Sequence, residues 1–407
     1  MNKKYWLYIA SHVYCSIKNG QVLLYNTKNG MYIENNTREI VALMQELHKK
    51  QNLGVTMIKD EQIMIAPYKL FVEEFCRKDM GGLIDYTQEK PIQLMPILSL
   101  QRDIEKLKKD KERYIGEGLL HYLLEINIYV NDICKAQCPL CTTYFKQSTC
   151  CTANNGQQLE LDRSLLQKIL TQIQDAPIGK LNILGGDISQ YTHYDKLASM
   201  LQSVNAQTHL WLNYLNTKNT EIPPRSFKYI IPVCFPIKES IFASCIKQLN
   251  KEKASYHFFI TCEDDYNQTT DLLDTYKISD YKLFPIFTGK NSCFFEEQIY
   301  MTKQDLFSSP LSFRKIFAHQ KLNANFFGSL TILPNGQVYA NINSPALGNI
   351  KTDNLLDLIN KEISDNTAWR KIRNEEPCND CLYQYLCPPP SNYETIIGKP
   401  NLCHVHP

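Results

Sequence analysis

Seven of the 15 cysteines in this 407-residue chain form two groups whose spacing suits metal binding. In the first group, three residues separate Cys134 from Cys138 and two separate Cys138 from Cys141. Three thiolates can bind three irons of a four-iron cluster, which leaves the fourth iron open to a small molecule that accepts an electron. The alternative interpretation is a structural zinc site that takes Cys150 or Cys151 as its fourth ligand.

The second group lies near the carboxyl end of the sequence and comprises Cys378, Cys381, Cys387 and Cys403. Four thiolates can fully ligate a four-iron cluster or bind one zinc ion. Full ligation favours electron transfer or a structural role over direct binding of a substrate. Six cysteines stand apart from both groups and are expected to be small buried side chains: Cys15, Cys76, Cys234, Cys245, Cys262 and Cys293.

The composition indicates a globular protein of two or three domains, with 43% hydrophobic residues and a net charge of +2. A dedicated nucleic-acid binder would usually show a strong basic excess, so no nucleic-acid partner is expected. No apolar run approaches the roughly 18 residues of a membrane-spanning helix, so no membrane association is expected. Clustered cysteines in a long intracellular chain are more often metal ligands than disulfides, and we expect a cytoplasmic protein.

The strand and helix patterns that must position the cysteines divide the chain into segments, of which the first two are residues 1–90 and 91–118. Residues 1–90 alternate short strands with amphipathic helices, which predicts a small winged-helix-like module. Residues 91–118 are polar and charged, as in a linker. The patterns in the module indicate strands at 5–9, 12–17, 22–26, 31–33 and 54–58 and helices at 37–47 and 69–78.

From residue 119 to 290, strand patterns alternate with helical patterns, which predicts an α/β fold with a parallel sheet that curls into a partial barrel of six units. Active sites of such barrels lie at the carboxyl ends of the strands, and Cys134 follows the first strand directly. Residues 291–407 form a separate tail with a hairpin at 329–340. The six expected strands are 123–130, 181–184, 210–214, 229–235, 256–261 and 281–287.

The first cysteine group, placed after the first strand of a six-unit barrel, resembles that of the radical S-adenosylmethionine (SAM) enzymes. The residues IleLeuGlyGlyAsp at 183–187 resemble the Gly-Gly-Glu motif with which this family holds the amino group of SAM. The resemblance implies a catalytic four-iron cluster on the three cysteines that reductively cleaves SAM to a 5′-deoxyadenosyl radical. It also implies SAM binding by Gly185, Gly186 and Asp187, although Asp187 replaces the usual Glu and reaches one methylene less.

Asn213, late in the third strand, is a further candidate for contact with SAM; an ordinary polar strand end is the alternative interpretation.

The carboxyl-terminal cysteines, together with GlyAsnIle at 348–350 and LeuLeuAspLeuIle at 355–359, resemble the SPASM domain of peptide-modifying radical SAM enzymes. This resemblance implies that the second group holds an auxiliary four-iron cluster. The family often has another auxiliary cluster, but Ala340 and Ser391 stand where its cysteines are common. We therefore expect two four-iron clusters in the whole chain: one that binds SAM and one auxiliary cluster. Zinc at the second group remains the alternative.

The amino-terminal module resembles the recognition element of enzymes that modify ribosomally made peptides. That element binds a leader peptide as an added strand at its sheet edge. A packing domain or a nucleic-acid-binding winged helix is the alternative. The opening MetAsnLysLysTyrTrp, the Cys150–Cys151 pair and CysProProProSerAsnTyrGlu at 387–394 further resemble radical-SAM-like proteins of the double-glycine-leader systems of Bacteroidales.

The combined resemblance implies an enzyme that modifies a ribosomal precursor peptide and takes electrons from a reductant such as flavodoxin or ferredoxin. A second hypothesis is a catalytically degenerate subunit that binds leader peptide for a second radical SAM protein. A third hypothesis is a zinc-stabilised protein of unrelated function.

Overall fold

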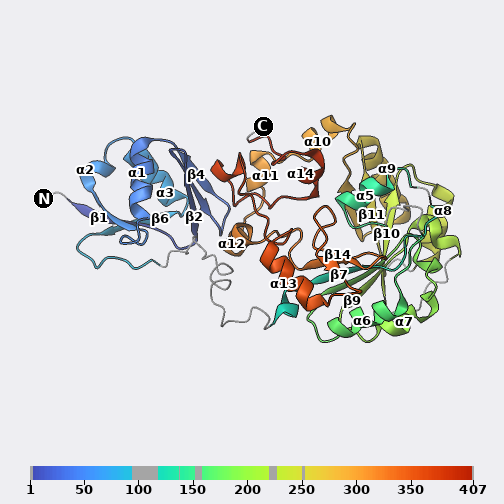
Figure 1. Ribbon diagram of the computed structural model, residues 1–407. Coiled ribbons are helices and arrows are strands. Elements are labelled where there is room, and N and C mark those ends of the chain that lie inside the picture. Colours follow the sequence, from blue (N-terminus) through green and yellow to red (C-terminus); the bar gives the residue numbers. More distant parts are fainter. Residues whose placement is uncertain are drawn as a thin grey trace.

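The structure, a computed structural model, describes residues 3–93, 118–136, 138–151, 158–219, 227–249 and 253–405. These residues form one nine-stranded sheet and two three-stranded sheets, with helices packed against them, so the expected α/β fold is confirmed (Figure 1). Of the expected linker at 91–118, all but residues 91–93 and 118 lie outside the described residues. None of the described helices is long and apolar enough to cross a membrane.

Two antiparallel sheets and three helices build the amino-terminal module. In the first sheet, β1 lies between β5 and β6; in the second, β3 lies between β2 and β4. The elements are β1 (Lys4–Ile9), β2 (Val13–Lys18), β3 (Gln21–Asn26), β4 (Tyr32–Asn35), α1 (Arg38–Leu47), β5 (Val55–Lys59), α2 (Asp60–Ile63), α3 (Tyr68–Arg77) and β6 (Gly81–Asp85).

Strand β6 was not predicted, because it opens with two glycines, which are depleted in strands. The pairing with β1 explains the first of them. A Cβ atom on Gly81 would lie 1.9 Å from the carbonyl oxygen of Tyr8, so only glycine fits this close approach of two backbones.

The main sheet has the order β12-β11-β10-β9-β8-β7-β13-β14-β15. Its six strands β7 to β12 are parallel and lie in chain order, so their carboxyl ends share one edge. All six expected strands are present, which confirms the predicted parallel sheet. They are β7 (Glu125–Tyr129), β8 (Lys180–Leu184), β9 (Gln207–Trp211), β10 (Lys228–Cys234), β11 (Ala254–Ile260) and β12 (Tyr281–Pro285).

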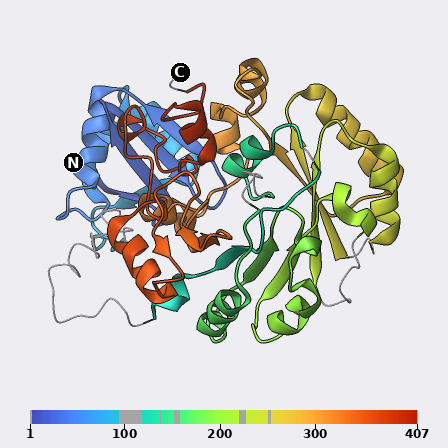
Figure 2. The ribbon, with the colours of Figure 1, turned by 45° about the vertical axis from the view of Figure 1, so that its right-hand side comes forward.

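Most helices that connect these strands pack on one face of the curved sheet (Figure 2), whereas the helix that begins at Cys141 packs on the other face through Tyr144 and Phe145. A single apolar core joins the first face to its helices, with Ile128, Ile183 and Val233 of the sheet buried against residues such as Leu170 and Phe242 of the helices. The helices and short 3₁₀ turns are η1 (Leu119–Tyr122), α5 (Cys141–Gln147), α6 (Arg163–Ile173), η2 (Ile188–Gln190), α7 (Tyr194–Leu201), η3 (Tyr214–Asn219), α8 (Glu239–Gln248) and α9 (Glu263–Tyr276).

Alternate residues of the strands point to the other face of the sheet, where a buried polar layer lies. The amide nitrogen of Asn182 donates to Asn127 Oδ1 over 2.7 Å. The Asn182 Oδ1 atom in turn lies 3.0 Å from His209 Nδ1. Burial, helped by nearby lysines, lowers the pKa of His209 to about 4, so this histidine is neutral near pH 7.

The tail adds three strands, β13, β14 and β15, to the main sheet beside β7. The predicted hairpin at 329–340 is confirmed as β13 and β14, but β13 also pairs in parallel with β7, which the sequence did not indicate. The tail contains α10 (Ser292–Gln298), α11 (Lys303–Phe307), α12 (Phe313–Lys321), β13 (Ser329–Ile332), β14 (Gln337–Tyr339), β15 (Gly348–Asn349), α13 (Leu355–Asp365), η5 (Cys378–Asp380) and α14 (Asn392–Ile397).

The amino-terminal module packs against this tail (Figure 1). The ring of Tyr32 in β4 stacks on Phe307 of α11, with centroids 3.8 Å apart. Glu34 accepts hydrogen bonds from Tyr383 Oη over 2.8 Å and from Lys303 Nζ over 2.6 Å. Lys18 Nζ donates to Gln384 Oε1 over 2.6 Å and also to the carbonyl of Asn379. The module therefore contacts the very loop that carries the second cysteine group.

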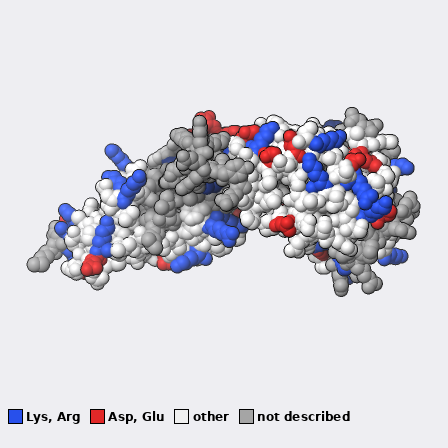
Figure 3. Space-filling view, turned by 60° about the horizontal axis from the view of Figure 1, so that its bottom comes forward, with Lys and Arg blue, Asp and Glu red and all other residues white. Residues whose placement is uncertain are grey.

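The isolated cysteines differ in exposure. Cys15, Cys234 and Cys245 are buried, as expected, and Cys262 is half-buried. Cys76 and Cys293 are exposed, so the prediction was wrong for these two. Both occupy the outer faces of short helices, α3 and α10, whose apolar faces are supplied by other residues. On the face drawn in Figure 3, basic and acidic side chains are intermingled over the part at the right of the view.

We predict that Tyr32→Ala weakens the docking of the module by about 2 kcal/mol, because a stacked ring pair and its buried area are lost. Hydrogen exchange at 303–307 and 381–386 should then accelerate by roughly tenfold or more. The matched control is Met57→Ala, which removes a 38% exposed side chain from the other sheet of the module. Unchanged exchange at both segments in Tyr32→Ala would contradict the described docking.

Candidate metal centres

The first cysteine group lies at the carboxyl edge of the parallel sheet. Cys134 and Cys138 are in the loop after β7, Cys141 is the first residue of α5, and all three are half-buried. The turn after β8 holds this loop through its backbone: Gly186 N donates to Asn131 O over 3.1 Å, and Asp187 N donates to Ile133 O over 2.6 Å. The two motifs singled out in the sequence are therefore neighbours in space.

The glycine turn and the cysteine loop approach each other too closely for a side chain. A Cβ atom on Gly186 would lie 2.3 Å from Ile133 O and 2.9 Å from Cys134 Cβ. A Cβ atom on Gly185 would lie 2.4 Å from Asn131 Oδ1. Only glycine fits at either position, which leaves bare backbone next to the cysteines. The two glycines therefore let the turn after β8 pack directly against the cysteine loop.

Side-chain amides point at the sulfurs of this group. Asn213 Nδ2, just past β9, donates to Cys138 Sγ over 3.4 Å, and Asn216 Nδ2 in η3 donates to Cys134 Sγ over 3.7 Å. The backbone N–H of Ala136 also donates to Cys134 Sγ over 3.4 Å. Such N–H donors stabilise thiolates and the sulfurs of iron–sulfur clusters. Asn216 was missed in the sequence; its only signal was its place three residues after Asn213.

Three further thiols surround the group. Cys150, Cys151 and Cys234 are buried in one cluster with Tyr144 and Phe259, and Cys138 packs against them. Asn213 Nδ2 lies 4.0 Å from Cys151 Sγ. Cys234 ends β10, so its position beside Cys138 follows from the alignment of parallel strand ends and is not visible in the local sequence.

These neighbours give the thiols of the first group different acidities. A hydrogen bond from Cys234, helped by one from Asn213, outweighs burial and lowers the pKa of Cys138 to about 7. Burial, together with the neighbouring thiols Cys151, Cys138 and Cys134, raises the pKa of Cys141 to about 12. In the metal-free protein, Cys138 is therefore the thiol of this pair that ionises near neutral pH.

Asp187 is used differently from the sequence-based expectation of a SAM contact. The residue is 9% exposed, and its carboxylate caps the short helix η2. Oδ1 accepts from Ser189 N over 3.1 Å and from Ser189 Oγ over 2.6 Å, and Oδ2 accepts from Gln190 Nε2 over 2.8 Å. Both oxygens thus have partners within their own turn, and a role for this side chain in SAM binding stays a prediction.

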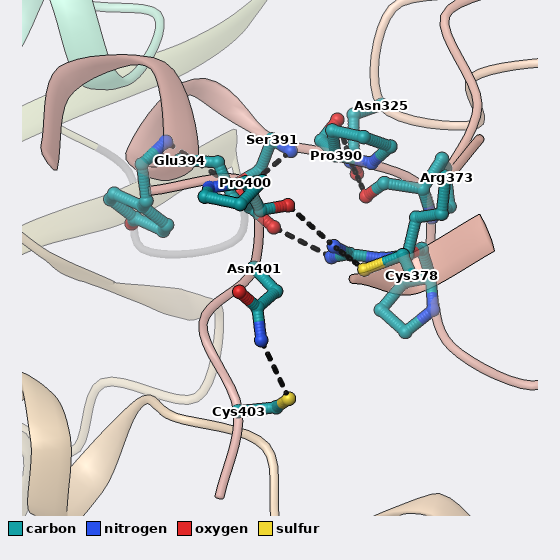
Figure 4. Close-up of polar contacts among 12 residues, drawn as sticks. Asn325, Arg373, Cys378, Pro390, Ser391, Glu394, Pro400, Asn401 and Cys403 are labelled. Carbon is teal, nitrogen blue, oxygen red and sulfur yellow. Dashed lines mark hydrogen bonds and ion pairs between the residues drawn. The ribbon is translucent and has the colours of Figure 1, made fainter. Parts of the chain in front are cut away.

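The four cysteines of the second group line one cavity of about 180 Å³. Four thiols around one cavity are the ligand set of either a four-iron cluster or a zinc ion. The sulfurs again accept N–H donors: Cys381 from Tyr383 N over 3.4 Å, and Cys403 from Asn401 Nδ2 over 3.2 Å (Figure 4). Burial raises the pKa of Cys387 to about 12.

Within the described residues, no three His, Cys, Asp or Glu side chains are arranged to hold a single metal ion, so metal binding at both groups stays a prediction. Ser391 and Ala340, which stand where the further auxiliary cluster would have cysteines, are part of the local structure. Ser391 caps α14 by accepting from Tyr393 N over 3.2 Å, and Ala340 is buried.

A second cavity, of about 320 Å³, lies between the parallel sheet and the tail and shares Asn325, Ser391 and Tyr393 with the cavity of the second cysteine group. Its lining is uncharged and rich in amides and hydroxyls. One of these, Ser148 Oγ, is a buried atom with no hydrogen-bond partner among the described residues. The residues with amides and hydroxyls in its lining are Asn127, Tyr129, Gln147, Ser148, Thr149, Asn325, Ser329, Thr331, Asn341, Ser391, Asn392 and Tyr393.

No family model and no curated protein sequence matches the chain. Among solved structures, Streptococcus suis SuiB bound to precursor peptide SuiA matches with a TM-score of 0.50 and 13% sequence identity, over 98% of each chain. SuiB bound to S-adenosylmethionine matches with a TM-score of 0.49 and 13% identity, over 97% of this chain and 98% of SuiB.

Native anSMEcpe with bound AdoMet matches with a TM-score of 0.44 and 12% identity, over 65% of this chain and 88% of anSMEcpe. At 13% identity, the likeness to SuiB bound to SuiA concerns the fold alone. This chain therefore has a fold similar to that of SuiB over nearly its whole length.

We predict that Gly186→Ala displaces the first cysteine loop, because the new Cβ atom would meet backbone that cannot move freely. After anaerobic reconstitution with iron and sulfide, the variant should lose about half of the iron while the second group keeps its share. The matched control is Gly179→Ala, whose Cβ would meet Leu124 O at an ordinary 3.6 Å. Full iron content in Gly186→Ala would count against iron binding at this loop.

We also predict that iodoacetamide labels Cys138 of the metal-free protein with a pH midpoint of about 7, while Cys141, with its pKa of about 12, stays unlabelled below pH 9. The thiolate is the reactive form, so a lowered pKa moves labelling to lower pH. Brief labelling followed by peptide mass spectrometry measures both residues in one sample. Asn213→Ala should raise the Cys138 midpoint; equal midpoints for the two cysteines would refute the assigned hydrogen bonds.

Proposed function

We propose that this chain is a radical SAM enzyme that modifies a ribosomally made precursor peptide. The observation that carries the proposal is the meeting of two motifs at the carboxyl edge of the six parallel strands. The loop of Cys134, Cys138 and Cys141 touches the glycine turn after β8. A fold similar to that of SuiB over 98% of the chain supports it. In this proposal, residues 119–290 form the partial radical SAM barrel, and residues 291–407 form a SPASM-like domain.

The three cysteines would hold a four-iron cluster with one open iron. When bound and reduced, such a cluster supplies the electron that cleaves SAM and generates a 5′-deoxyadenosyl radical. The protein residues position and shield the ligand. Gly185 and Gly186 let the turn after β8 pack against the cysteine loop and would help to seat SAM there, and Asn213 and Asn216 donate to the cysteine sulfurs.

Cys378, Cys381, Cys387 and Cys403 would hold one auxiliary four-iron cluster in the cavity that they line. With all four irons ligated by thiolates, this cluster serves electron transfer or structure and does not bind substrate directly. The electrons would come from a small reductant such as flavodoxin or ferredoxin.

The substrate would be a precursor peptide, as in the solved structure of SuiB with SuiA. The amino-terminal module, residues 1–90, would bind its leader by adding it as a strand to an open sheet edge. Strands β5 and β6 each have one partner, β1, among the described residues, so each has an edge available. The uncharged cavity between sheet and tail suits the amides of a peptide. The narrower resemblance, carried by the opening residues, the Cys150–Cys151 pair and residues 387–394, would place the chain in a double-glycine-leader system of Bacteroidales.

One observation favours a second candidate, a degenerate partner subunit that binds leader peptide for another radical SAM protein. The carboxylate of Asp187, assigned by motif to the SAM amino group, has its oxygens engaged by Ser189 and Gln190. Weak SAM binding would follow if no other group replaced it. This candidate predicts iron binding without SAM cleavage.

We predict that reconstituted protein contains about eight irons and forms 5′-deoxyadenosine when SAM and dithionite are added. Cys138→Ala should abolish this product and lose about half of the iron, because the SAM-binding cluster loses a ligand. Cys293→Ala, at an exposed cysteine outside both groups, is the matched control and should leave both values unchanged.

Other results have distinct meanings. About eight irons with no deoxyadenosine, even with candidate precursor peptide present, would support the partner-subunit candidate. Zinc in place of iron would contradict both candidates and would favour a zinc-stabilised protein of other function.

A further inference from the structure

A buried arginine lies against the second cysteine group and joins its separate segments. The side chain of Arg373 is 11% exposed. Its Nη1 lies 3.9 Å from Cys378 Sγ and 3.4 Å from the carbonyl oxygen of Pro400, while its Nε donates to the carbonyl of Pro388 (Figure 4). Pro388 follows Cys387 directly, and Pro400 precedes Cys403 by three residues. The guanidinium thus touches each stretch that supplies a cysteine to the cavity.

A buried carboxylate balances this charge from the opposite side. Glu394 is 8% exposed, and its Oε1 lies 2.6 Å from Arg373 Nη2. Its Oε2 accepts from Ser391 N over 2.9 Å and from Ser391 Oγ over 2.6 Å, in the cap of α14. Both partners are therefore fixed in place. The cation faces the cysteine sulfur, and the anion is held by the helix cap (Figure 4).

The positive charge of Arg373 lies next to the cavity, and the negative charge of Glu394 lies behind it. Both charges would affect the reduction potential of a redox centre in the cavity. A cluster held by four thiolates gains one negative charge when it is reduced. A cation and an N–H donor at a ligand sulfur stabilise the more negative, reduced form and so raise the reduction potential. A carboxylate behind the cation opposes this effect. Buried ion pairs contribute little net stability, because desolvation offsets their attraction, so stability alone does not account for this pair.

We propose that Arg373 is a positioning residue that raises the reduction potential of the auxiliary cluster, and that Glu394 limits the size of this increase. The inference rests on the proposed function, which assigns an iron–sulfur cluster to Cys378, Cys381, Cys387 and Cys403. It goes beyond that function, since it assigns to two residues outside the ligand set the task of setting the potential of the cluster.

The test uses the full chain with the first group removed, Cys134→Ala/Cys138→Ala/Cys141→Ala, so that only the second group can bind iron. After anaerobic reconstitution, the midpoint potential is measured by a redox titration followed by electron paramagnetic resonance. Arg373→Gln removes the charge and should lower the potential. Glu394→Gln keeps a side chain that can accept in the helix cap but removes the negative charge, and it should raise the potential.

Arg373→Lys is the matched control, because it keeps the positive charge and loses the fork of donors; its potential should lie between those of the parent and Arg373→Gln. Shifts of opposite sign in Arg373→Gln and Glu394→Gln support the inference, since a merely structural role would not produce them. Unchanged potentials, or shifts of the same sign, would overturn it. If Arg373→Gln fails to retain iron, Glu394→Gln decides: a raised potential supports the inference, and an unchanged or lowered one overturns it.

The same preparation separates this inference from the proposed function. Zinc instead of iron in the parent protein would defeat the proposed function, and the inference with it. Iron with a potential that does not respond to the two substitutions would defeat the inference alone.

Discussion

The pairing of β7 on both of its edges is the constraint on which the rest of this structure depends. β7 forms parallel ladders with β8 on one side and with β13 on the other, although β13 comes some 200 residues later in the chain. The ladders fix the register of three segments at once. As a result, the loop after β7, the glycine turn after β8 and the turn between β13 and β14 lie at one edge of a continuous sheet.

The two cysteine groups share the same two influences on their sulfurs, burial and N–H donors. Their sulfurs are partly or largely buried, which opposes ionisation, and N–H donors from asparagine, arginine or backbone point at them, which favours it. At Cys138 the hydrogen bonds dominate and the pKa falls, while at Cys141 and Cys387 burial dominates and the pKa rises. Such thiols would lose their protons on binding a metal, which links the site to cluster assembly.

The amino-terminal module directly contacts the loop that carries the second cysteine group. Its sheet of β2, β3 and β4 packs on the tail, and Lys18 reaches the loop between Cys378 and Cys387 through Asn379 and Gln384. Its other sheet retains the edges of β5 and β6. A peptide added to one of these edges would therefore bind to a body that also supports the wall of the second cysteine cavity.

The sequence by itself determined the local features. Period-two and period-3.6 patterns identified the strands and helices, because each element buries one of its own faces, and cysteine spacing identified both groups. Only the tertiary structure decided which distant residues meet: Cys234 beside Cys138, β13 beside β7, and Arg373 between Pro388 and Pro400. The physical reason is that such contacts depend on strand register and on closure of the chain. Neither leaves a signal in the spacing of neighbouring residues.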